Sequence, residues 1–255
     1  MNILVCIKQV PDAETVFGVS EDGTRVLIPG NAVYRLNRFD EYALEEALLL
    51  KDRAGARVHA VSIGSPRVES ALRRAMEMGA HAAYRLDPGS GEEPQTIEKA
   101  RLVAAWAAGR EYDLILTGIM SEDSMSCMFA PALAEHLGVS SATAVMVLDV
   151  RQEEGMVVAE REIDSSRREV VTLALPAVLA VQSGINRPRY PSLSNVMRAK
   201  GQVIETASAA RGTGHAAPIS RFREVSARRE GRILKGSPGE KAAALCDYFH
   251  EAGVL

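Results

Sequence analysis

Short apolar runs alternate with amphipathic stretches along the first half of the chain. Residues 2–7 are almost continuously apolar, as expected of a strand that is buried on both faces of a parallel sheet. Further strands are expected at residues 57–63, 82–86 and 113–117, and helices at residues 39–53, 68–78 and 95–108. Because repeated βα units of this length form parallel sheets with right-handed crossovers, the pattern predicts an α/β fold with an open, mostly parallel sheet flanked by helices.

The second half begins with further strand patterns. Residues 156–163 and 169–175 are rich in β-branched and apolar residues and are joined by a polar turn, and a third apolar run covers residues 177–181. We expect these runs to form adjoining strands, the first two as a β-hairpin extension of the sheet.

The segment after these strands cannot continue the sheet. Pro188 and Pro191 fix their backbone φ angles and have no N–H group to donate, so the chain is expected to project here as a stiff loop. The loop holds Tyr190 and Leu193, which are poor choices for a solvated surface. Residue chemistry alone leaves two interpretations open: these side chains fold back onto the core, or another molecule covers them.

Ligands of open α/β sheets bind beyond the carboxyl ends of the strands, where helix N-termini offer free amides. This rule predicts a pocket built from four separated segments, residues 6–10, 37–40, 63–65 and 118–129. The chain has neither a GxGxxG fingerprint nor a Walker-type lysine loop, so a nucleotide in this pocket would be held without those motifs.

Residues 118–129 carry most of the chemistry of the predicted pocket. Gly118 permits a sharp turn after a strand, and the Ser-Glu-Asp-Ser run at 121–124 supplies polar and capping groups before a helix expected over residues 127–137. By pattern alone, a capped crossover helix without a ligand is the simpler interpretation.

Composition and charge restrict the class of protein. The net charge of −3 and the pI of about 6.0 do not favour nucleic-acid binding, although they are compatible with a local basic patch. Cys6, Cys127 and Cys246 match no metal or redox spacing and are interpreted as reduced thiols of a cytosolic-type compartment. The N-terminus has no targeting pattern, and no apolar run approaches the roughly 20 residues that span a bilayer. A cytoplasmic protein without a membrane span is expected.

The chain shows no pattern typical of a catalytic centre. Its five histidines are scattered, and none stands near a serine or cysteine at a spacing that indicates a nucleophile and its base.

The C-terminal part differs from the rest in composition. Residues 207–217 are small and lack periodicity, so they are expected to behave as a flexible linker. Residues 219–234 are rich in arginine, and Ser237 with Pro238 forms a helix start signal before an apolar pattern that ends near Phe249. We expect one α/β domain over residues 1–206 and a linker with a C-terminal arm over residues 207–255.

Three stretches of the chain, ILVCIKQVPD, AEREID and LPAVLAVQSGINRPRYPSLSNVMRAK, closely resemble the β subunits of electron transfer flavoproteins. The resemblance covers nearly the whole chain, and the run PRYPSLSNVMRAK is its most specific part. It implies a Rossmann-like sheet of the adenine-nucleotide α-hydrolase type. It also implies a heterodimer with an α subunit that holds most of the FAD, and this heterodimer would carry electrons from acyl-CoA-type dehydrogenases of fatty acid β-oxidation toward a quinone-linked oxidoreductase. The missing catalytic centre fits a carrier, because redox chemistry would belong to the flavin.

The same resemblance implies a nucleotide in the predicted pocket. Most members of the family hold AMP there, whereas electron-bifurcating members hold a second FAD; we expect AMP and keep the second FAD as the alternative. Asp123 matches the family, but residues 126–130 read Ser-Cys-Met-Phe-Ala and depart from its usual pattern. The residues implied as cofactor contacts are Cys6, Asn37, Arg38, Phe39, Asp40, Ile63, Gly118, Asp123, Ser126, Cys127, Met128 and Phe129.

Contacts with other proteins are implied as well. In the family, the loop that carries Tyr190 and Leu193 docks on partner dehydrogenases, the glutamate matching Glu162 meets the mobile flavin domain or a partner's arginine, and the C-terminal arm wraps over the α subunit. A stand-alone nucleotide-binding protein of the universal-stress type would have a similar sheet but would lack the projecting loop, and it remains the second hypothesis.

Overall fold

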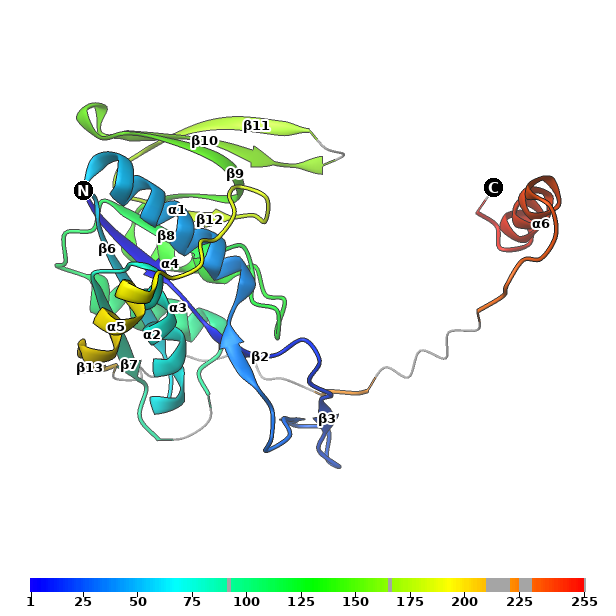
Figure 1. The fold of residues 1–255 in the computed structure, drawn as a ribbon, viewed down its shortest axis with the longest axis horizontal. Helices are drawn as coiled ribbons and strands as arrows, with labels where there is room; N and C mark the ends of the chain where they lie inside the picture. Colours follow the sequence, from blue (N-terminus) through cyan, green and yellow to red (C-terminus); the bar gives the residue numbers. More distant parts are fainter. Residues whose placement is uncertain (91–92, 165–166, 210–220, 225–230, 255) are drawn as a thin grey trace. The chain divides into compact units, whose positions relative to one another are not determined.

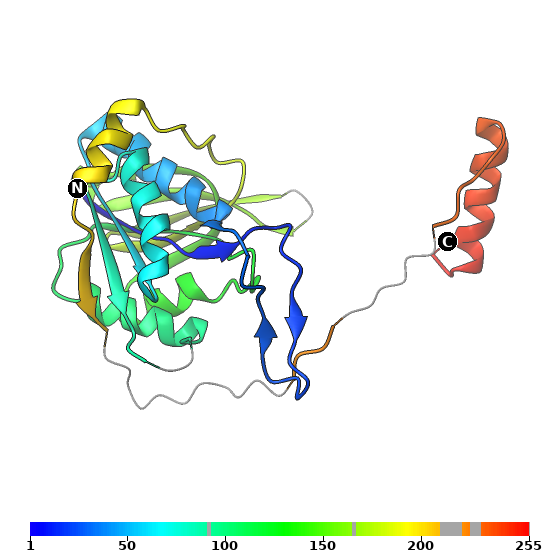
Figure 2. The same ribbon diagram turned by 60° about the horizontal axis from the view of Figure 1, so that its bottom comes forward.

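The protein is described here by a computed structural model covering residues 1–90, 93–164, 167–209, 221–224 and 231–254. Within these residues the main feature is a nine-stranded sheet of order β11-β10-β9-β12-β8-β1-β6-β7-β13, with helices on both faces (Figures 1 and 2). Six of its eight strand pairs are parallel, and only β10 pairs antiparallel, with β9 and β11. The predicted open, mostly parallel α/β sheet is confirmed.

The strands of this sheet are β1 (Asn2–Cys6), β6 (Arg57–Ile63), β7 (Ala82–Asp87), β8 (Leu114–Gly118), β9 (Ser140–Arg151), β10 (Met156–Glu162), β11 (Arg168–Ala174), β12 (Ala177–Val181) and β13 (Glu205–Ser208). Four short strands form two separate two-stranded sheets, β2 (Gln9–Pro11) with β5 (Tyr34–Leu36) and β3 (Gly18–Val19) with β4 (Val26–Leu27). The helices are α1 (Arg38–Ala54), α2 (Glu69–Met78), α3 (Thr96–Ala107), α4 (Phe129–Leu137), α5 (Leu193–Gly201) and α6 (Pro238–Glu251), with 3₁₀ turns η1 (Pro66–Val68) and η2 (Gln152–Glu154).

The core consists of two layers, one on each face of the sheet. Along β1, Ile3 and Val5 pack with the apolar residues of α1 and α2, whereas Leu4 and Cys6 pack with those of α3 and α4. All four side chains are buried, because a strand that is covered on both faces has no position left for water. This explains why the strand is continuously apolar in sequence.

One strand was not expected from the sequence. The sequence predicted that the runs at 169–175 and 177–181 form adjoining strands. This is wrong, because β9 and β10 lie between them in the sheet. β9 begins with Ser140 and Ser141 and mixes exposed with buried positions, but its residues 144–148, Ala-Val-Met-Val-Leu, form an apolar run that was not predicted as a strand from the sequence. It also changes register near Ala144, whose positive φ of 59° marks an irregularity in the strand.

Three boundaries differ from those expected. The helix predicted over residues 127–137 begins at Phe129, so Cys127 precedes it and Met128 occupies its N-cap position. The projecting loop ends sooner than expected, since Leu193 already begins α5, capped by the Ser192 side chain. β13 includes residues 207 and 208, so the first residues of the expected linker pair with β7.

The chain divides into two compact units. The first comprises Met1–Phe17 and Ile28–Ile219 and contains the nine-stranded sheet; the second comprises Gly18–Leu27 and Ser220–Leu255. In the second unit, α6 forms as predicted and begins with a capping box between Ser237 and Glu240. Most of the expected linker and much of the arginine-rich stretch fall at 210–220 and 225–230, outside the described residues.

Candidate functional site

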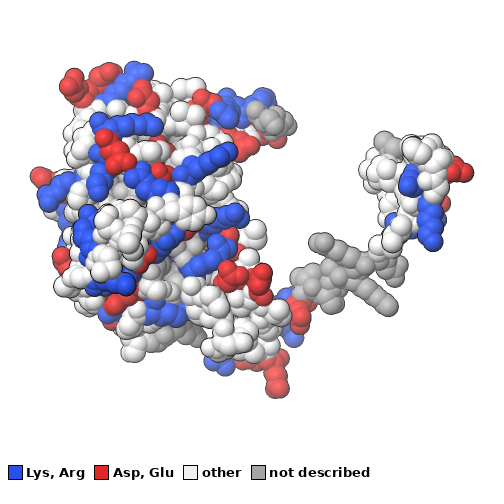
Figure 3. Space-filling model, viewed as in Figure 1, with Lys and Arg blue, Asp and Glu red and all other residues white. Residues whose placement is uncertain are grey.

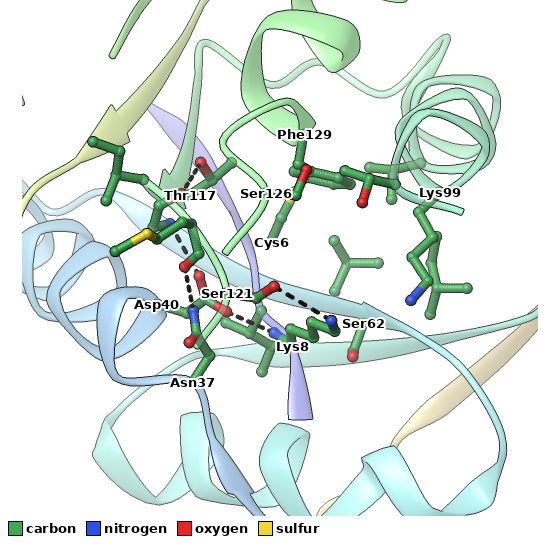
Figure 4. A pocket seen from close by; sticks show the side chains of 18 residues that line it. Cys6, Lys8, Asn37, Asp40, Ser62, Lys99, Thr117, Ser121, Ser126 and Phe129 are labelled. Carbon is green, nitrogen blue, oxygen red and sulfur yellow. Dashed lines mark hydrogen bonds between the residues drawn. The ribbon is translucent and has the colours of Figure 1, made fainter. Parts of the chain in front are cut away.

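A pocket of about 90 Å³ opens at the carboxyl ends of β1, β6 and β8 (Figure 4). This is the edge of the sheet where the sequence predicted a ligand site. Its lining comes from these strand ends, the start of α1, the first turn of α3 and the loop between β8 and α4. The lining residues are Cys6, Ile7, Lys8, Asn37, Asp40, Val61, Ser62, Ile63, Thr96, Lys99, Val103, Thr117, Gly118, Ile119, Met120, Ser121, Ser126 and Phe129.

Asp40, in the first turn of α1, joins three elements at the base of the pocket. Its Oδ2 accepts a hydrogen bond from the backbone N–H of Lys8 at 2.7 Å, and its Oδ1 accepts one from the backbone N–H of Gly118 at 3.0 Å. Desolvation by burial outweighs these bonds and raises the pKa of the Asp40 carboxyl to about 7. Since both carboxylate oxygens bond to backbone N–H groups, Asp40 positions the pocket walls.

Gly118 is the point of closest approach between β8 and α1. A Cβ atom at this position would stand 2.6 Å from Asp40 Oδ1 and equally close to the backbone carbon and Cβ of Phe39. Such distances are far inside van der Waals contact, so only glycine fits. The sequence predicted a glycine-dependent turn here, and the structure shows that the requirement comes from close packing.

Asn37 fixes the loop that follows β8. Its Nδ2 donates to the carbonyl of Met120 at 2.9 Å, and its Oδ1 accepts from the backbone N–H of Glu122 at 3.1 Å. The Glu122 carboxylate in turn pairs with Arg35 of β5 at 3.0 Å. An asparagine before a helix commonly caps it, but the Asn37 side chain makes no capping hydrogen bond to α1.

Two lysines face the pocket. Lys8 Nζ contacts Asp123 Oδ1 at 2.7 Å and Ser121 Oγ at 3.3 Å, and Lys99 Nζ pairs with Glu93. Burial, together with repulsion from Lys8, lowers the pKa of Lys99, while Glu93 acts in the opposite direction. Two ammonium groups that repel each other in one pocket favour an anionic ligand beside them.

The pocket also contains buried groups of different chemistry. The Ser62 side chain is buried, and within the described residues its Oγ has no hydrogen-bond partner. A buried hydroxyl without a partner is costly, and Ser62 lies on the same side of the pocket as Lys8 and Lys99 in Figure 4. Cys6 is buried beside Asp40, and burial raises the pKa of its thiol, so the sulfur stays protonated and is not a nucleophile.

The predicted cofactor contacts divide into two groups. Seven line the pocket: Cys6, Asn37, Asp40, Ile63, Gly118, Ser126 and Phe129. The structure does not place the other five, Arg38, Phe39, Asp123, Cys127 and Met128, in the lining. Arg38, Asp123, Cys127 and Met128 are exposed, although Asp123 still acts on the pocket through its ion pair with Lys8.

Several lining residues were missed by sequence reasoning. Lys8 follows β1 and lies inside one of the predicted segments, although it was not named as a contact. Ser62 and Thr117 are each the next-to-last residue of their strand, β6 and β8. Thr96 and Lys99 come from α3, whose N-terminal turn follows β7 and therefore faces the same edge of the sheet. Applying the strand-end rule to the β7–α3 connection as well would have found them.

The segment expected to project is exposed. Tyr190 is 93% exposed, Leu193 79% and Met197 61%, so neither Tyr190 nor Leu193 folds back onto the core of this chain. We call residues 186–197 the docking arm. Figure 3 shows Lys and Arg side chains gathered over the face that carries α1, α2 and α5. Arg187, Arg198 and Lys200 of that face are themselves exposed.

Glu162, the remaining predicted partner contact, is the last residue of β10. It is exposed and lies in register with Arg168 of β11 at the end of the hairpin. Its neighbour Arg161 points to the chain itself, donating to the carbonyl of Thr143 at 3.2 Å and pairing with Glu169 at 3.4 Å. Arg161 thus stabilises the hairpin that presents Glu162.

The described part of the chain lacks two further features. Within it, no group of three or more His, Cys, Asp or Glu side chains is arranged to hold a metal ion. None of its helices is long and apolar enough to cross a membrane.

Comparison with known proteins gives a consistent result. The electron transfer flavoprotein domain matches residues 24–211. The chain is 31% identical over 264 residues to electron transfer flavoprotein subunit beta of Bacillus subtilis, with 100% of each chain covered. It is 30% identical over 261 residues to the subunit beta of Methylophilus methylotrophus, with 98% of each chain covered. It is also 30% identical over 267 residues to subunit CarD of the caffeyl-CoA reductase-Etf complex of Acetobacterium woodii, with 100% of each chain covered.

Proposed function

The chain belongs to the family of electron transfer flavoprotein β subunits, and we propose that it binds a nucleotide and docks redox partners within a heterodimer. Members of this family are electron-transfer subunits and not enzymes with catalytic residues of their own. In the proposed heterodimer, an α subunit holds most of the FAD, and the flavin supplies the redox chemistry. The residues of this chain bind the nucleotide and position the redox partners.

The pocket at the carboxyl ends of β1, β6 and β8 is the observation that carries the proposal. Lys8 and Lys99 offer positive charge to a phosphate, and the unpartnered Ser62 hydroxyl offers a hydrogen bond to a polar group of the ligand. The apolar walls at Val61, Ile63 and Phe129 suit a flat base. These residues fit an adenine nucleotide, and we propose AMP as the ligand.

The departure at residues 126–130 is compatible with this ligand. Of the predicted contacts in that run, only Ser126 and Phe129 line the pocket. Most of the pocket frame is held by backbone N–H groups and by Asp40 and Asn37, which the departure leaves unchanged. A second FAD in the same pocket, as part of an electron-bifurcating heterodimer, is the alternative.

The docking arm supports the second half of the proposal. Tyr190, Leu193 and Met197 are 93%, 79% and 61% exposed and lie close together in sequence, as in the exposed apolar patches that mark protein interaction sites. We propose that Tyr190 and Leu193 dock on an acyl-CoA-type dehydrogenase, with Glu162 meeting the flavin domain or a partner's arginine. Electrons would then pass to a quinone-linked oxidoreductase. This role would place the protein in the cytoplasm, in fatty acid β-oxidation.

Cofactor content tests the proposal directly. The chain is co-expressed with its α subunit, the complex is purified and denatured, and the released FAD and AMP are counted per heterodimer. One FAD with one AMP is the expected result. Two FADs without AMP would replace AMP by the bifurcating alternative. A colourless monomer that never associates with an α subunit would overturn the proposal in favour of a stand-alone nucleotide-binding protein.

A further inference from the structure

Arg189 connects the docking arm to the middle of α1, although the two segments are far apart in sequence. Its Nε lies 2.9 Å from Glu45 Oε2 and 3.1 Å from Oε1, and its Nη2 lies 2.9 Å from Oε1. The backbone N–H of Arg189 donates to the same carboxylate at 3.0 Å. Glu45 therefore accepts both side-chain and backbone hydrogen bonds from one residue of the arm.

The environment of this pair makes it hard to break. The Glu45 side chain is only 5% exposed, whereas Arg189 is 31% exposed and also reaches Asp52 at 2.9 Å. A carboxylate that is so deeply buried needs a cation and hydrogen bonds, because water cannot replace them. The guanidinium has the planar fork that satisfies both oxygens together.

Other contacts hold the arm at both ends. Just beyond its last residue, α5 is fixed on α2, because the Arg73 guanidinium donates to the carbonyls of Ala199 and Gln202. The root of the arm is held by α1. Asn186 Nδ2 donates to the carbonyl of Tyr42 at 3.0 Å and to Glu46 Oε2 at 2.9 Å, so α1 holds residues 186–189 through two side chains. Pro188 precedes Arg189, and Pro191 follows two residues later; each limits the backbone φ angle at its own position. Tyr190 and Leu193, just beyond the fixed root, are the exposed residues.

We propose that the Glu45–Arg189 pair is a positioning device that holds the docking arm in its binding conformation before a partner arrives. This inference rests on the proposed docking function of Tyr190 and Leu193. Binding orders flexible segments at a cost in free energy, and an arm that is already fixed avoids that cost. Glu45 and Arg189 are then positioning residues that act through Tyr190 and Leu193 without needing to touch the partner dehydrogenase.

The test uses the complete heterodimer as the substrate of its dehydrogenase, with KM for the heterodimer and kcat measured separately. Glu45→Gln keeps the size of the side chain and removes its charge. We expect KM to rise about tenfold with kcat within twofold, and with FAD and nucleotide content unchanged. Arg189→Lys keeps the charge but loses the fork, and an intermediate rise in KM is expected. Asp149→Asn, which breaks an exposed ion pair with Arg151 on β9, is the matched control and should change neither constant.

A double-mutant cycle separates positioning from general stability. If Glu45 acts through the arm, adding Glu45→Gln to Leu193→Ala should raise KM much less than it does in the wild-type background. Trypsin provides a readout without a partner: cleavage after Arg189 should be faster in the Glu45→Gln heterodimer than in wild type and in Asp149→Asn.

The outcomes distinguish the two proposals. If Leu193→Ala leaves KM unchanged, the docking function itself fails. If Leu193→Ala raises KM but Glu45→Gln and Arg189→Lys do not, or if the effects of Glu45→Gln and Leu193→Ala are simply additive, the positioning role is overturned. If Glu45→Gln does not fold, Arg189→Lys carries the same measurements, including the cycle with Leu193→Ala.

Discussion

Two buried carboxylates on α1 serve two different regions of the molecule. Asp40, in the first turn, lines the pocket at the carboxyl ends of β1, β6 and β8 and binds the backbone N–H groups of Lys8 and Gly118. Glu45, little more than one turn further, holds the docking arm and binds the guanidinium of Arg189. The Asp40 carboxylate thus binds backbone groups of the pocket frame, whereas the Glu45 carboxylate binds both the backbone N–H and the guanidinium of Arg189.

This difference explains how each region tolerates sequence change. Backbone N–H groups are present whatever the side chain, so a pocket frame that is held by them survives substitutions such as those at residues 126–130. The arm depends on a particular arginine and a particular glutamate. We therefore expect substitutions at the pocket base to act on folding, and substitutions on the arm to act on partner binding alone.

The largest effect is expected from Gly118→Ala. The new Cβ would lie 2.6 Å from backbone and side-chain atoms of α1, so the helix or β8 must move, at a cost of about 3 kcal/mol or more. Chemical denaturation of the heterodimer measures this loss. Gly201→Ala is the matched control, since nothing lies within 4 Å of its added Cβ. Equal stability of the two variants would contradict the close packing at Gly118.

Asp40→Asn should be the next most damaging change. An asparagine oxygen can accept from Lys8 or Gly118, but its NH₂ group would face the other backbone N–H, so we expect a loss of about 1–3 kcal/mol at pH 8. The same denaturation measurement checks it. A variant as stable as wild type would show that the carboxylate does not bridge the two strands.

The pH dependence of stability gives Asp40 a second test. Its pKa is about 7 in the folded chain and close to 3.8 in the unfolded chain, so the folded state retains a proton between these values. Stability should therefore fall as pH rises from about 4 to 7 and level off above. The difference between the wild-type and Asp40→Asn curves isolates this group from other carboxyls that burial affects, such as Glu41 and Glu46. Parallel curves for the two proteins would contradict a raised pKa of Asp40 in the folded chain.

On the arm, Leu193→Ala should leave stability unchanged and weaken docking. Leu193 is 79% exposed, so its truncation removes few contacts within the chain. If it anchors the interface, the loss is about 2 kcal/mol, or roughly 30-fold in KM for reduction by the dehydrogenase. FAD and nucleotide content should stay at wild-type levels. A fall in flavin content would indicate that the residue is structural.

The smallest effect is expected from Lys8→Met. The ammonium of Lys8 is partly exposed, and removing it should reduce the affinity for AMP about tenfold through the loss of one charge-assisted hydrogen bond. Calorimetric titration of nucleotide-free heterodimer with AMP measures this change. Lys241→Met on α6 is the control, since it changes the charge equally at a residue that does not line the pocket. Equal affinity in both variants would remove Lys8 from the ligand site.

Much of the fold could be predicted because the signals are local. The continuous apolar run of β1 spans a few residues, and the apolar stripe of α1 spans a few helical turns. The apolar run at 144–148 was a local signal for β9, but the start of the strand was not: Ser140 and Ser141 belong to it because β12 pairs alongside them. Burial of Leu173 on β11 likewise follows from the tertiary core and not from the pattern of its own strand.

The candidate site shows the same division. The strand-end rule predicted the pocket and most of its segments, whereas Arg38, Cys127 and Met128, which the resemblance implied as cofactor contacts, lie outside its lining. Lys99 was missed because it stands on a helix that reaches the pocket only through the crossover from β7. The direction of a side chain is set by the packing of its element, which local sequence does not contain.

By itself, the sequence determined the α/β class, the edge of the sheet where the pocket opens, and an arm with two prolines and two large apolar residues. Only the tertiary structure decided that those residues stay exposed, that Gly118 must be glycine, and that Arg189 reaches a glutamate 144 positions away. Periodicity and turn chemistry act over a few residues and are visible in the chain. Exposure, close approach and ion pairing depend on which distant segments meet, and they are settled only when the sheet brings those segments together.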